Sequence, residues 1–311
     1  MEGKKDMEAI IGTRGSLLAV TQATWVKKEL EKNFTGLKIN LKKIKTMGDK
    51  ILDVPLAKVG GKGLFVKEIE DALLRGEVDI AVHSMKDLPA DIPQGLIISA
   101  VTFREDPSDV LISRDGKGLS ELPVEARIGT SSLRRISQLL HFRTDLMMIQ
   151  LRGNLDTRLK KLDKGDVDAI ILAAAGVKRM GWESRITEYI THDISLPATG
   201  QGALGIETRE SDTTINGMVA RLNHPETSRC VTAERTFLGK LQGGCQVPIA
   251  ALARIEGDQM VMEGLVASID GKRLVRQRIS GNQMEHEKLG LLLAERLLSL
   301  GADRILKEIY G

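Results

Sequence analysis

Cysteine is scarce in this sequence of 311 residues, which contains only Cys230 and Cys245. No Cys-x-x-Cys pair occurs, so metal sites built on cysteine clusters are excluded. A stabilising disulfide is also unexpected in a cytosolic protein with so few cysteines. Aromatic residues make up 3% of the chain, which leaves few stacking platforms for single-stranded nucleic acid.

A strong net charge and long apolar runs are absent as well. The net charge is +3, which is too small for a dedicated nucleic-acid binder. No apolar run reaches the length that spans a membrane, and residues 1–6 lack the apolar stretch of a secretory signal. We therefore expect a cytoplasmic protein without nucleic-acid or membrane partners. We also expect a monomer, because nothing in the sequence suggests a large apolar interface.

The residues that are present describe an ordinary globular protein, with 42% hydrophobic and 28% charged residues. A chain of this length usually divides into two or three domains.

Two parts of the chain repeat the same pattern. A predicted strand ends at residues 12–16, where Ser16 caps a predicted helix, and residues 129–135 form a similar junction. Residues 76–82 and 165–171 each contain Gly, an acidic residue, Val and Asp, followed by a buried strand. The repeat predicts two α/β domains of like build. Each would offer a helix N-terminus, which favours anions, to a shared cleft.

Polar side chains gather after the strand predicted at 79–82, in the stretch His83-Ser84-Met85-Lys86-Asp87-Leu88-Pro89. In open α/β sheets, ligands bind at the carboxyl ends of strands. Asp87 is therefore well placed for proton transfer or for stabilising a cation. The alternative is a surface ion pair between Asp87 and Lys86, which is the commoner case for adjacent charges.

Two glycine-rich stretches need separate interpretations. Residues 46–63, which include Lys62, form either a mobile loop that closes over an anionic ligand or a solvated surface loop. The stretch is not a Walker A loop, because neither the first glycine nor the final Ser or Thr is present. Residues 200–205 match G-x-G-x-x-G, but Pro197 precedes them and a strand-like run follows, so we discount a dinucleotide site.

Arginines cluster near predicted strand and helix ends. The guanidinium fork matches carboxylates and phosphates in bidentate fashion. So many at such positions favour a large polyanionic ligand over one small acid, and the alternative is a solvated basic face. The arginines concerned are Arg14, Arg134, Arg135, Arg152, Arg158 and Arg179.

A small α+β unit follows residue 223. A helix at 226–241 carries Cys230 inward, and three strands at 249–255, 260–269 and 273–279 come later, followed by helices at the chain end. Between them, the turn Gly243-Gly244-Cys245-Gln246-Val247-Pro248 presents a thiol. That thiol fits a nucleophile, a metal ligand, a redox centre or an attachment point, or else a small apolar residue filling a bend.

Seven motifs in order resemble the porphobilinogen deaminase family, also called hydroxymethylbilane synthase, from about Ile10 to the C-terminus. The motifs are Arg14 with Ser16, residues 59–65, residues 83–87, residues 129–135, residues 151–154, residues 197–202 and residues 243–248. Met47 departs from the pattern, because a small or polar residue is expected in that loop.

The resemblance implies a dipyrromethane cofactor held by Cys245 through a thioether. Porphobilinogen units would be joined head to tail on this primer with loss of ammonia, and hydrolysis would then release a linear tetrapyrrole. Asp87, aided by Lys86, matches the catalytic position. Further residues matching cofactor contacts are Ser84, Lys86, Asp87, Thr130, Ser132, Arg134, Arg135 and Arg152. Residues matching substrate contacts are Arg14, Ser16, Arg152, Arg158, Arg179, Lys62 and Phe65.

The family fold implied is two periplasmic-binding-protein-like α/β domains around a cleft, plus a small C-terminal α+β domain with a three-stranded antiparallel sheet. We expect the first at 1–103 with 200–220, the second at 104–199 and the third at 221–311. A transient hand-off of product to the next enzyme of the pathway is also expected.

Two other functions compete with this reading. A non-catalytic solute-binding or ligand-sensing protein would also place two α/β domains around an anion cleft, but it gives Cys245 no role. A nicotinamide-dependent dehydrogenase rests only on the glycines at 200–205.

Overall fold

The computed structural model describes residues 7–50, 63, 65–243 and 247–310 of the chain. They form two compact units. Unit 1 contains Met1–Arg104 with Ala203–Ser228, and unit 2 contains Glu105–Gly202 with Arg229–Gly311. None of the helices in these residues combines the length and apolar character needed to cross a membrane.

Unit 1 is built on a five-stranded sheet in the order β2-β1-β3-β10-β4. The strands are β1 (Met7–Thr13), β2 (Leu37–Lys43), β3 (Ile80–Ser84), β4 (Leu96–Val101) and β10 (Leu204–Arg209). Strands β2, β1 and β3 are parallel, whereas β10 runs antiparallel to both of its neighbours. The helices are α1 (Leu17–Asn33), α2 (Met47–Lys50), α4 (Lys67–Leu74) and α8 (Thr213–Val219).

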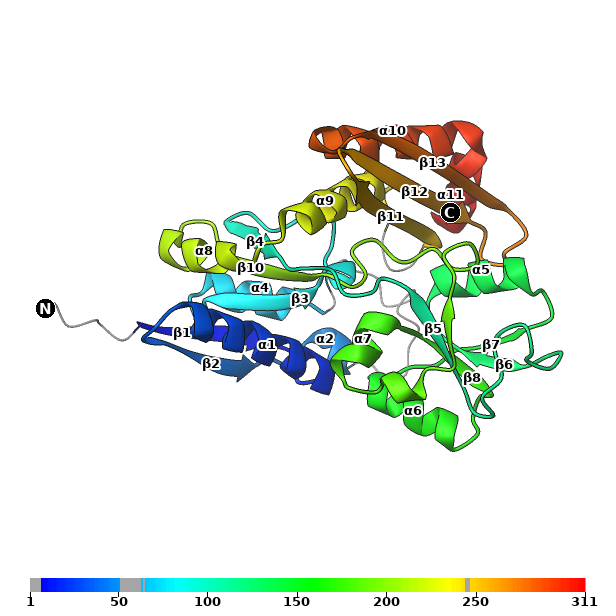
Figure 1. Cartoon of the computed structure of the whole chain (residues 1–311), viewed down its shortest axis with the longest axis horizontal. Helices are drawn as coiled ribbons and strands as arrows, with labels where there is room; N and C mark the ends of the chain where they lie inside the picture. The colour runs from blue at the N-terminus through cyan, green and yellow to red at the C-terminus, as the bar shows by residue number, and fades with distance from the viewer. Residues whose placement is uncertain (1–6, 51–62, 64, 244–246, 311) are drawn as a thin grey trace, which may run out of the picture. The chain divides into compact units, whose positions relative to one another are not determined.

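Helices cover both faces of this sheet, because successive strand residues point to opposite sides. Ile11 and Ile80 pack with Val26 of α1, whereas Ile10 lies in the separate cluster that contains Leu73 of α4. Figure 1 shows α1 along one side of the strands. The Oγ atom of Ser16 accepts the N–H of Ala19 at 3.3 Å, so the predicted cap of α1 is confirmed.

Unit 2 repeats this arrangement in the order β7-β6-β8-β5-β9. The strands are β5 (Asp109–Ser113), β6 (Arg127–Gly129), β7 (Met147–Ile149), β8 (Ala169–Ala173) and β9 (Glu188–Ile190). Three strands are again parallel, and the fourth, β5, is antiparallel to its neighbours. The helices are α5 (Leu133–Phe142), α6 (Leu155–Asp163) and α7 (Ala174–Arg179). The predicted pair of sister α/β domains is therefore confirmed by strand order.

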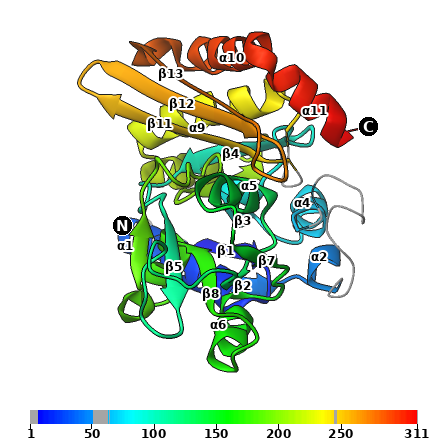
Figure 2. The same ribbon diagram turned by 90° about the vertical axis from the view of Figure 1, so that its right-hand side faces the viewer.

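The C-terminal part of unit 2 is a three-stranded antiparallel sheet, β11 (Ile249–Glu256), β12 (Gln259–Ala267) and β13 (Leu274–Asn282). Helices α9 (Pro225–Lys240), α10 (His286–Leu297) and α11 (Asp303–Tyr310) accompany it, and Figure 2 shows α10 along the sheet. One core joins Phe237, Met262, Leu293 and the buried Cys230. The predicted inward position of Cys230 and the α+β class are confirmed.

Some predictions fall outside the described residues. Cys245 and Lys62 lie there, as does most of the loop expected at 46–63. The division into three domains stays a prediction, since the compact units group residues 105–202 with the C-terminal part.

Candidate active site

The carboxyl end of β3 carries the acidic residue singled out in the sequence. Strand β3 ends at Ser84 and is followed by a 3-10 turn, η1 (Met85–Asp87). The N–H of Met85 donates to the carbonyl of Ala203 at 3.0 Å, and the Met85 side chain is buried. It fits because residue 205 is glycine, where a Cβ atom would lie 2.3 Å from the Met85 Sδ atom. This packing anchors the turn that bears Asp87.

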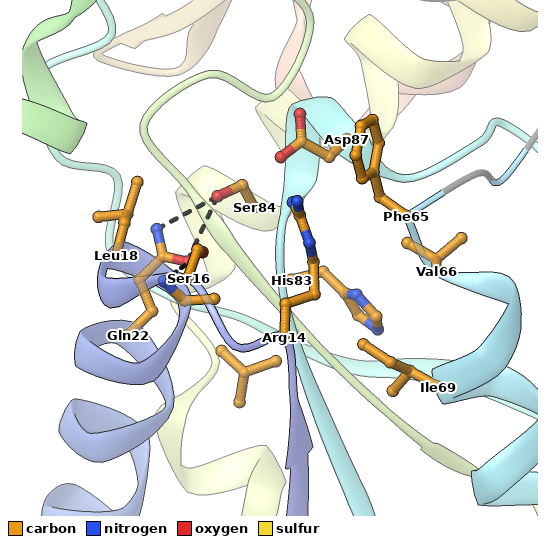
Figure 3. A pocket seen from close by; sticks show the side chains of 12 residues that line it. Arg14, Ser16, Leu18, Gln22, Phe65, Val66, Ile69, His83, Ser84 and Asp87 are labelled. Carbon is orange, nitrogen blue, oxygen red and sulfur yellow. Dashed lines mark hydrogen bonds between the residues drawn. The ribbon is translucent and has the colours of Figure 1, made fainter. Parts of the chain in front are cut away.

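A hollow of about 60 Å³ lies beside this turn, within unit 1. Figure 3 shows its lining side chains, which come from the β1–α1 junction, α1, the start of α4 and the end of β3. The hollow brings together five residues predicted to bind cofactor or substrate. They are Arg14, Ser16, Phe65, Ser84 and Asp87.

Arg14 brings the positive charge to this hollow. Its Cζ atom lies 4.3 Å from the centroid of the Phe65 ring, a cation–π contact that holds the guanidinium in place. In Figure 3 the guanidinium is directed toward the Asp87 carboxylate. A cationic group and a carboxylate thus face the same small space, which suits a ligand carrying both an acidic arm and a polarised N–H.

Ser84 is held by a residue that the sequence analysis missed. The Nε2 atom of Gln22 donates to the Ser84 Oγ atom at 3.2 Å, and Gln22 is buried. The available signal was one polar residue on the face of α1 that otherwise buries Ala23, Val26 and Leu30.

Unit 2 contains most of the predicted arginines, and two of them face inward. Arg134 and Arg135 are each 5% exposed and both bind Asp109, which is fully buried. The shortest N–O distance from each guanidinium to the Asp109 carboxylate is 2.7 Å. Burial alone would raise the pKa of Asp109, but the two arginines outweigh it and hold that pKa well below its usual range. These two guanidinium groups, expected at a ligand, are thus engaged by an internal carboxylate. Their contact with a cofactor carboxylate stays a prediction.

The other three arginines predicted at the site, Arg152, Arg158 and Arg179, differ in their surroundings. Among the described residues, the guanidinium of Arg152 has no hydrogen-bond or ion-pair partner. The Nε atom of Arg158 donates to the Gly153 carbonyl at 2.9 Å. Arg179 donates to the Gly202 carbonyl at 2.6 Å. Burial lowers the pKa of Arg179 to about 10, although Glu105 opposes the shift. A desolvated guanidinium with so little compensation favours an incoming anion.

The predicted hydroxyl donors of unit 2 lie at the β6–α5 junction. Thr130 is buried, and its Oγ1 atom accepts the N–H of Ser132 at 3.3 Å. Ser132 occupies the N-cap position of α5, whose first turn contains no acidic residue. The junction therefore offers donors and the positive end of a helix dipole, as its counterpart at Ser16 does.

Comparison with known proteins identifies the family. Residues 9–217 match the model described as "Porphobilinogen deaminase, dipyromethane cofactor binding domain", and residues 228–299 match "Porphobilinogen deaminase, C-terminal domain". The chain belongs to the porphobilinogen deaminase family.

Relatives of known name agree with this family over nearly the whole chain. Porphobilinogen deaminase of Geobacter metallireducens is 58% identical over 300 residues, covering 96% of this chain and 94% of the relative. The enzyme of Pelobacter propionicus is 57% identical over 300 residues and covers 96% of both chains. Among solved structures, the substrate binding domain of a putative molybdenum ABC transporter from Clostridium difficile covers 69% of this chain and 90% of that chain, with a TM-score of 0.44 and 12% identity. That likeness is too weak to add to what the strand order shows.

The residues of this porphobilinogen deaminase family member fit a dipyrromethane group chemically. Such a group carries carboxylate arms and pyrrole N–H donors. Arg14 and Arg152 suit the arms, and the carboxylate of Asp87 suits the N–H groups. Five of the predicted residues, Arg14, Ser16, Phe65, Ser84 and Asp87, line the hollow of unit 1. The predicted residues between 130 and 179 belong to unit 2. Lys86 lies on η1 next to Asp87.

Proposed function

We propose that this chain is a porphobilinogen deaminase whose primer is attached to the Cys245 sulfur and whose catalytic carboxylate is Asp87. It joins four porphobilinogen units and releases hydroxymethylbilane for tetrapyrrole biosynthesis. When bound, the dipyrromethane cofactor supplies the pyrrole end that is extended. The observation that carries the assignment to Asp87 is the hollow of unit 1, where this carboxylate faces Arg14 at the carboxyl end of β3.

Asp87 acts by charge. When porphobilinogen loses its aminomethyl nitrogen as ammonia, the remaining methylene-pyrrole is a cation. A carboxylate fixed beside it stabilises that cation more than it stabilises the neutral pyrrole, which lowers the barrier. The buried Met85 and the pairing of Ser84 with β10 keep the carboxylate in place. Lys86, on the same turn, assists with a positive charge near the acidic arms.

The arginines and hydroxyl groups bind the acidic arms. Arg14 and Ser16 serve the hollow of unit 1, with Phe65 holding Arg14, and Ser84 donates from the end of β3. On unit 2 the proposed donors are Thr130, Ser132, Arg134, Arg135, Arg152, Arg158 and Arg179. Lys62, which lies outside the described residues, is also proposed as a substrate contact. Arg152 is the strongest of the unit 2 arginines, because among the described residues it has no internal partner.

Intact-mass spectrometry combined with ammonia release tests this function. The purified wild type should carry the mass of a dipyrrole adduct and release ammonia from porphobilinogen. Cys245→Ala should lack both, whereas Cys230→Ala, which alters the only other cysteine, should keep both. Asp87→Asn should keep the adduct but lose at least 100-fold in turnover, because an amide carries no charge to balance the cation.

Specific results would overturn the proposal. An unmodified mass in an active wild-type preparation, or an adduct that persists in Cys245→Ala, would show that the primer is not attached to the Cys245 sulfur. Turnover of Asp87→Asn within threefold of wild type would remove the carboxylate from the mechanism. The rival reading, a non-catalytic binding protein, predicts bound porphobilinogen without ammonia release, and the family membership does not favour it.

Three further features belong to the proposal. The protein works in the cytoplasm, it is a monomer, and it passes its product transiently to the next enzyme of the pathway. Sedimentation at micromolar concentration checks the monomer, with a mass near the 34.0 kDa of one chain expected.

A further inference from the structure

Three titratable side chains are buried together next to the hollow of unit 1, and the proposed reaction uses none of them. They are Glu70 on α4, His83 on β3 and Glu207 on β10. The Nε2 atom of His83 lies 2.9 Å from the Glu207 Oε2 atom, with side-chain exposures of 4% and 0%. Glu70 is 7% exposed. Within the described part of the chain, the Oε1 atoms of both glutamates are buried and have no hydrogen-bond partner.

The charges of this cluster do not balance if every group is ionised. Among the described residues, His83 is the only basic group paired with either glutamate. A carboxylate can only accept, so His83 Nε2 carries the hydrogen in this bond. An unpaired buried carboxylate costs several kcal/mol, and a group in that position takes up a proton instead. A metal does not resolve the imbalance, since no three acidic, His or Cys side chains of the described chain are arranged to hold one.

Glu70 is the member best suited to hold the proton. The pKa of Glu70 is raised to about 7, and burial is the largest cause. Repulsion from Glu207 on β10 and from Asp71 on its own helix also raises this pKa, while His83 on β3 lowers it. The orphaned Oε1 atom agrees with this state. Glu207, by contrast, has the His83 hydrogen bond to stabilise its charge.

The cluster is physically continuous with the proposed site. His83 lines the hollow and immediately precedes Ser84, and it pairs with Gly205, which makes room for Met85 of the Asp87 turn. Figure 3 shows the His83 ring directed toward Ile69 on α4, away from Asp87. The same two strands therefore carry two members of the cluster, His83 and Glu207, and hold the turn that bears Asp87 at the end of β3.

We propose that Glu70 holds a proton in the active form of the enzyme, and that the buried cluster of Glu70, His83 and Glu207 positions the turn bearing Ser84 and Asp87. The inference rests on the proposed function. These three are positioning residues, because they act through β3 and β10 and do not touch the reacting atoms. Ionisation of Glu70 adds a negative charge next to the hollow, and this charge repels the acidic arms of porphobilinogen. Turnover therefore falls as Glu70 loses its proton.

The pH dependence of the variant Glu70→Gln tests the proposal. Glutamine copies the shape of a protonated carboxyl but never ionises. We expect the ratio of kcat/KM for Glu70→Gln over wild type to rise at least fivefold between pH 6 and pH 8.5. Glu210→Gln, which removes one exposed charge just after β10, should give a ratio that does not change with pH. A flat ratio for Glu70→Gln would overturn the proposal.

Infrared spectroscopy gives a readout that does not need activity. With glutamate labelled by ¹³C, the wild type at pH 6 should show the C=O band of a protonated buried carboxyl, and the band should disappear through pH 7. The band should be present in Glu210→Gln and absent in Glu70→Gln. In Glu207→Gln it should disappear at lower pH, because the charge that raises the Glu70 pKa has gone.

The two readouts separate the possible failures. If the wild type released no ammonia, the proposed function would fail while the band still decided the protonation of Glu70. If the wild type turned over normally and showed no such band, the inference would fail and the function would stand. Should Glu70→Gln not fold, the titration of the wild-type band and its shift in Glu207→Gln decide the question.

Discussion

At the scale of single residues, the arginines of unit 2 divide into two classes that the sequence makes look alike. Arg134 is buried against Asp109, with an N–O distance of 2.7 Å, and its guanidinium also donates to the Leu196 carbonyl at 2.8 Å. Arg152 is partly buried, and within the described residues nothing compensates its charge. The first kind of arginine stabilises the unit in addition to its proposed contact with the cofactor, whereas the second kind has its charge available for an anion.

Leucine substitutions should separate the two classes. Arg134→Leu strands the buried carboxylate with one arginine instead of two, so we expect it to lower the free energy of unfolding by about 3 kcal/mol. Arg152→Leu should change that free energy by less than about 1 kcal/mol, yet lower kcat/KM by about 10- to 100-fold through one lost carboxylate contact. Urea denaturation and steady-state kinetics on both variants measure this. Equal stability losses in the two variants would contradict the division.

The sequence could not reveal this division, because the partner that decides it is distant in the chain. Asp109 begins β5, which is 25 residues before Arg134. The motif correctly placed Arg134 at the start of a helix. Which way a side chain points from a helix start depends on packing, and the one buried aspartate that pairs with it gives no local signal.

At the scale of elements, the repeat seen in the sequence corresponds to a shared hydrogen-bond pattern. Asp79 accepts the N–H of Ile10 at 2.9 Å, and Asp168 accepts the N–H of Arg127 at 2.9 Å. In each case an aspartate leading into one parallel strand binds the backbone of its neighbour. This recurring role explains why two short matches were enough to predict two sister domains.

Of the two strands that break the repeat, β10 was indicated by the strand-like run after residues 200–205, whereas β5 was missed. The antiparallel fourth strand is β10 in unit 1 and β5 in unit 2, so one comes late in the chain and the other early. A sequence repeat preserves order and cannot show such an exchange. The short strand β9 was also missed, because its three residues include an exposed Tyr189 and give no clear alternation.

At the scale of elements, alanine substitutions at two helical glycines should change the stability of the fold in opposite directions. In α10, a Cβ atom at Gly290 would lie 2.4 Å from the Ala233 carbonyl oxygen of α9. A backbone carbonyl cannot move aside without moving its helix, so Gly290→Ala should force the two helices apart. We expect this to lower the free energy of unfolding by about 1–3 kcal/mol. In α8, nothing lies within 4 Å of a Cβ atom at Gly217. Gly217→Ala should therefore stabilise the fold by about 0.5–1 kcal/mol.

Thermal and urea unfolding of these two variants check the prediction. Each variant adds one methyl group in a helix, so each controls for the other's change in helix propensity. A stabilised Gly290→Ala would mean that α9 and α10 do not approach as closely as the structure shows.

At the scale of the whole molecule, the family and the fold class could be predicted from the sequence. The pairing of buried charged and titratable side chains could not. Seven co-ordered motifs indicated the family, and alternating strands and helices indicated two α/β units. The buried pairing of His83 with Glu207 joins residues 124 positions apart. Glu207 looked like an ordinary strand residue, although a glutamate within an otherwise apolar stretch was the available signal.

The free energy of unfolding of the whole protein should depend on pH through the buried Glu70. Its pKa is raised from 4.5 to about 7 in the folded state, so the folded state binds its proton more tightly than the unfolded state does. This contribution to stability is fully present below pH 4.5 and is lost as the pH rises through about 7. Glu70→Gln has no such proton to lose. The free energy of unfolding of wild type minus that of Glu70→Gln should therefore fall by about 3 kcal/mol from pH 4.5 to pH 8. Urea denaturation at both values measures it, with Glu210→Gln as the control whose difference from wild type stays constant. A difference that rises with pH would mean that Glu70 is stabilised as a carboxylate, in the direction opposite to the one its burial dictates.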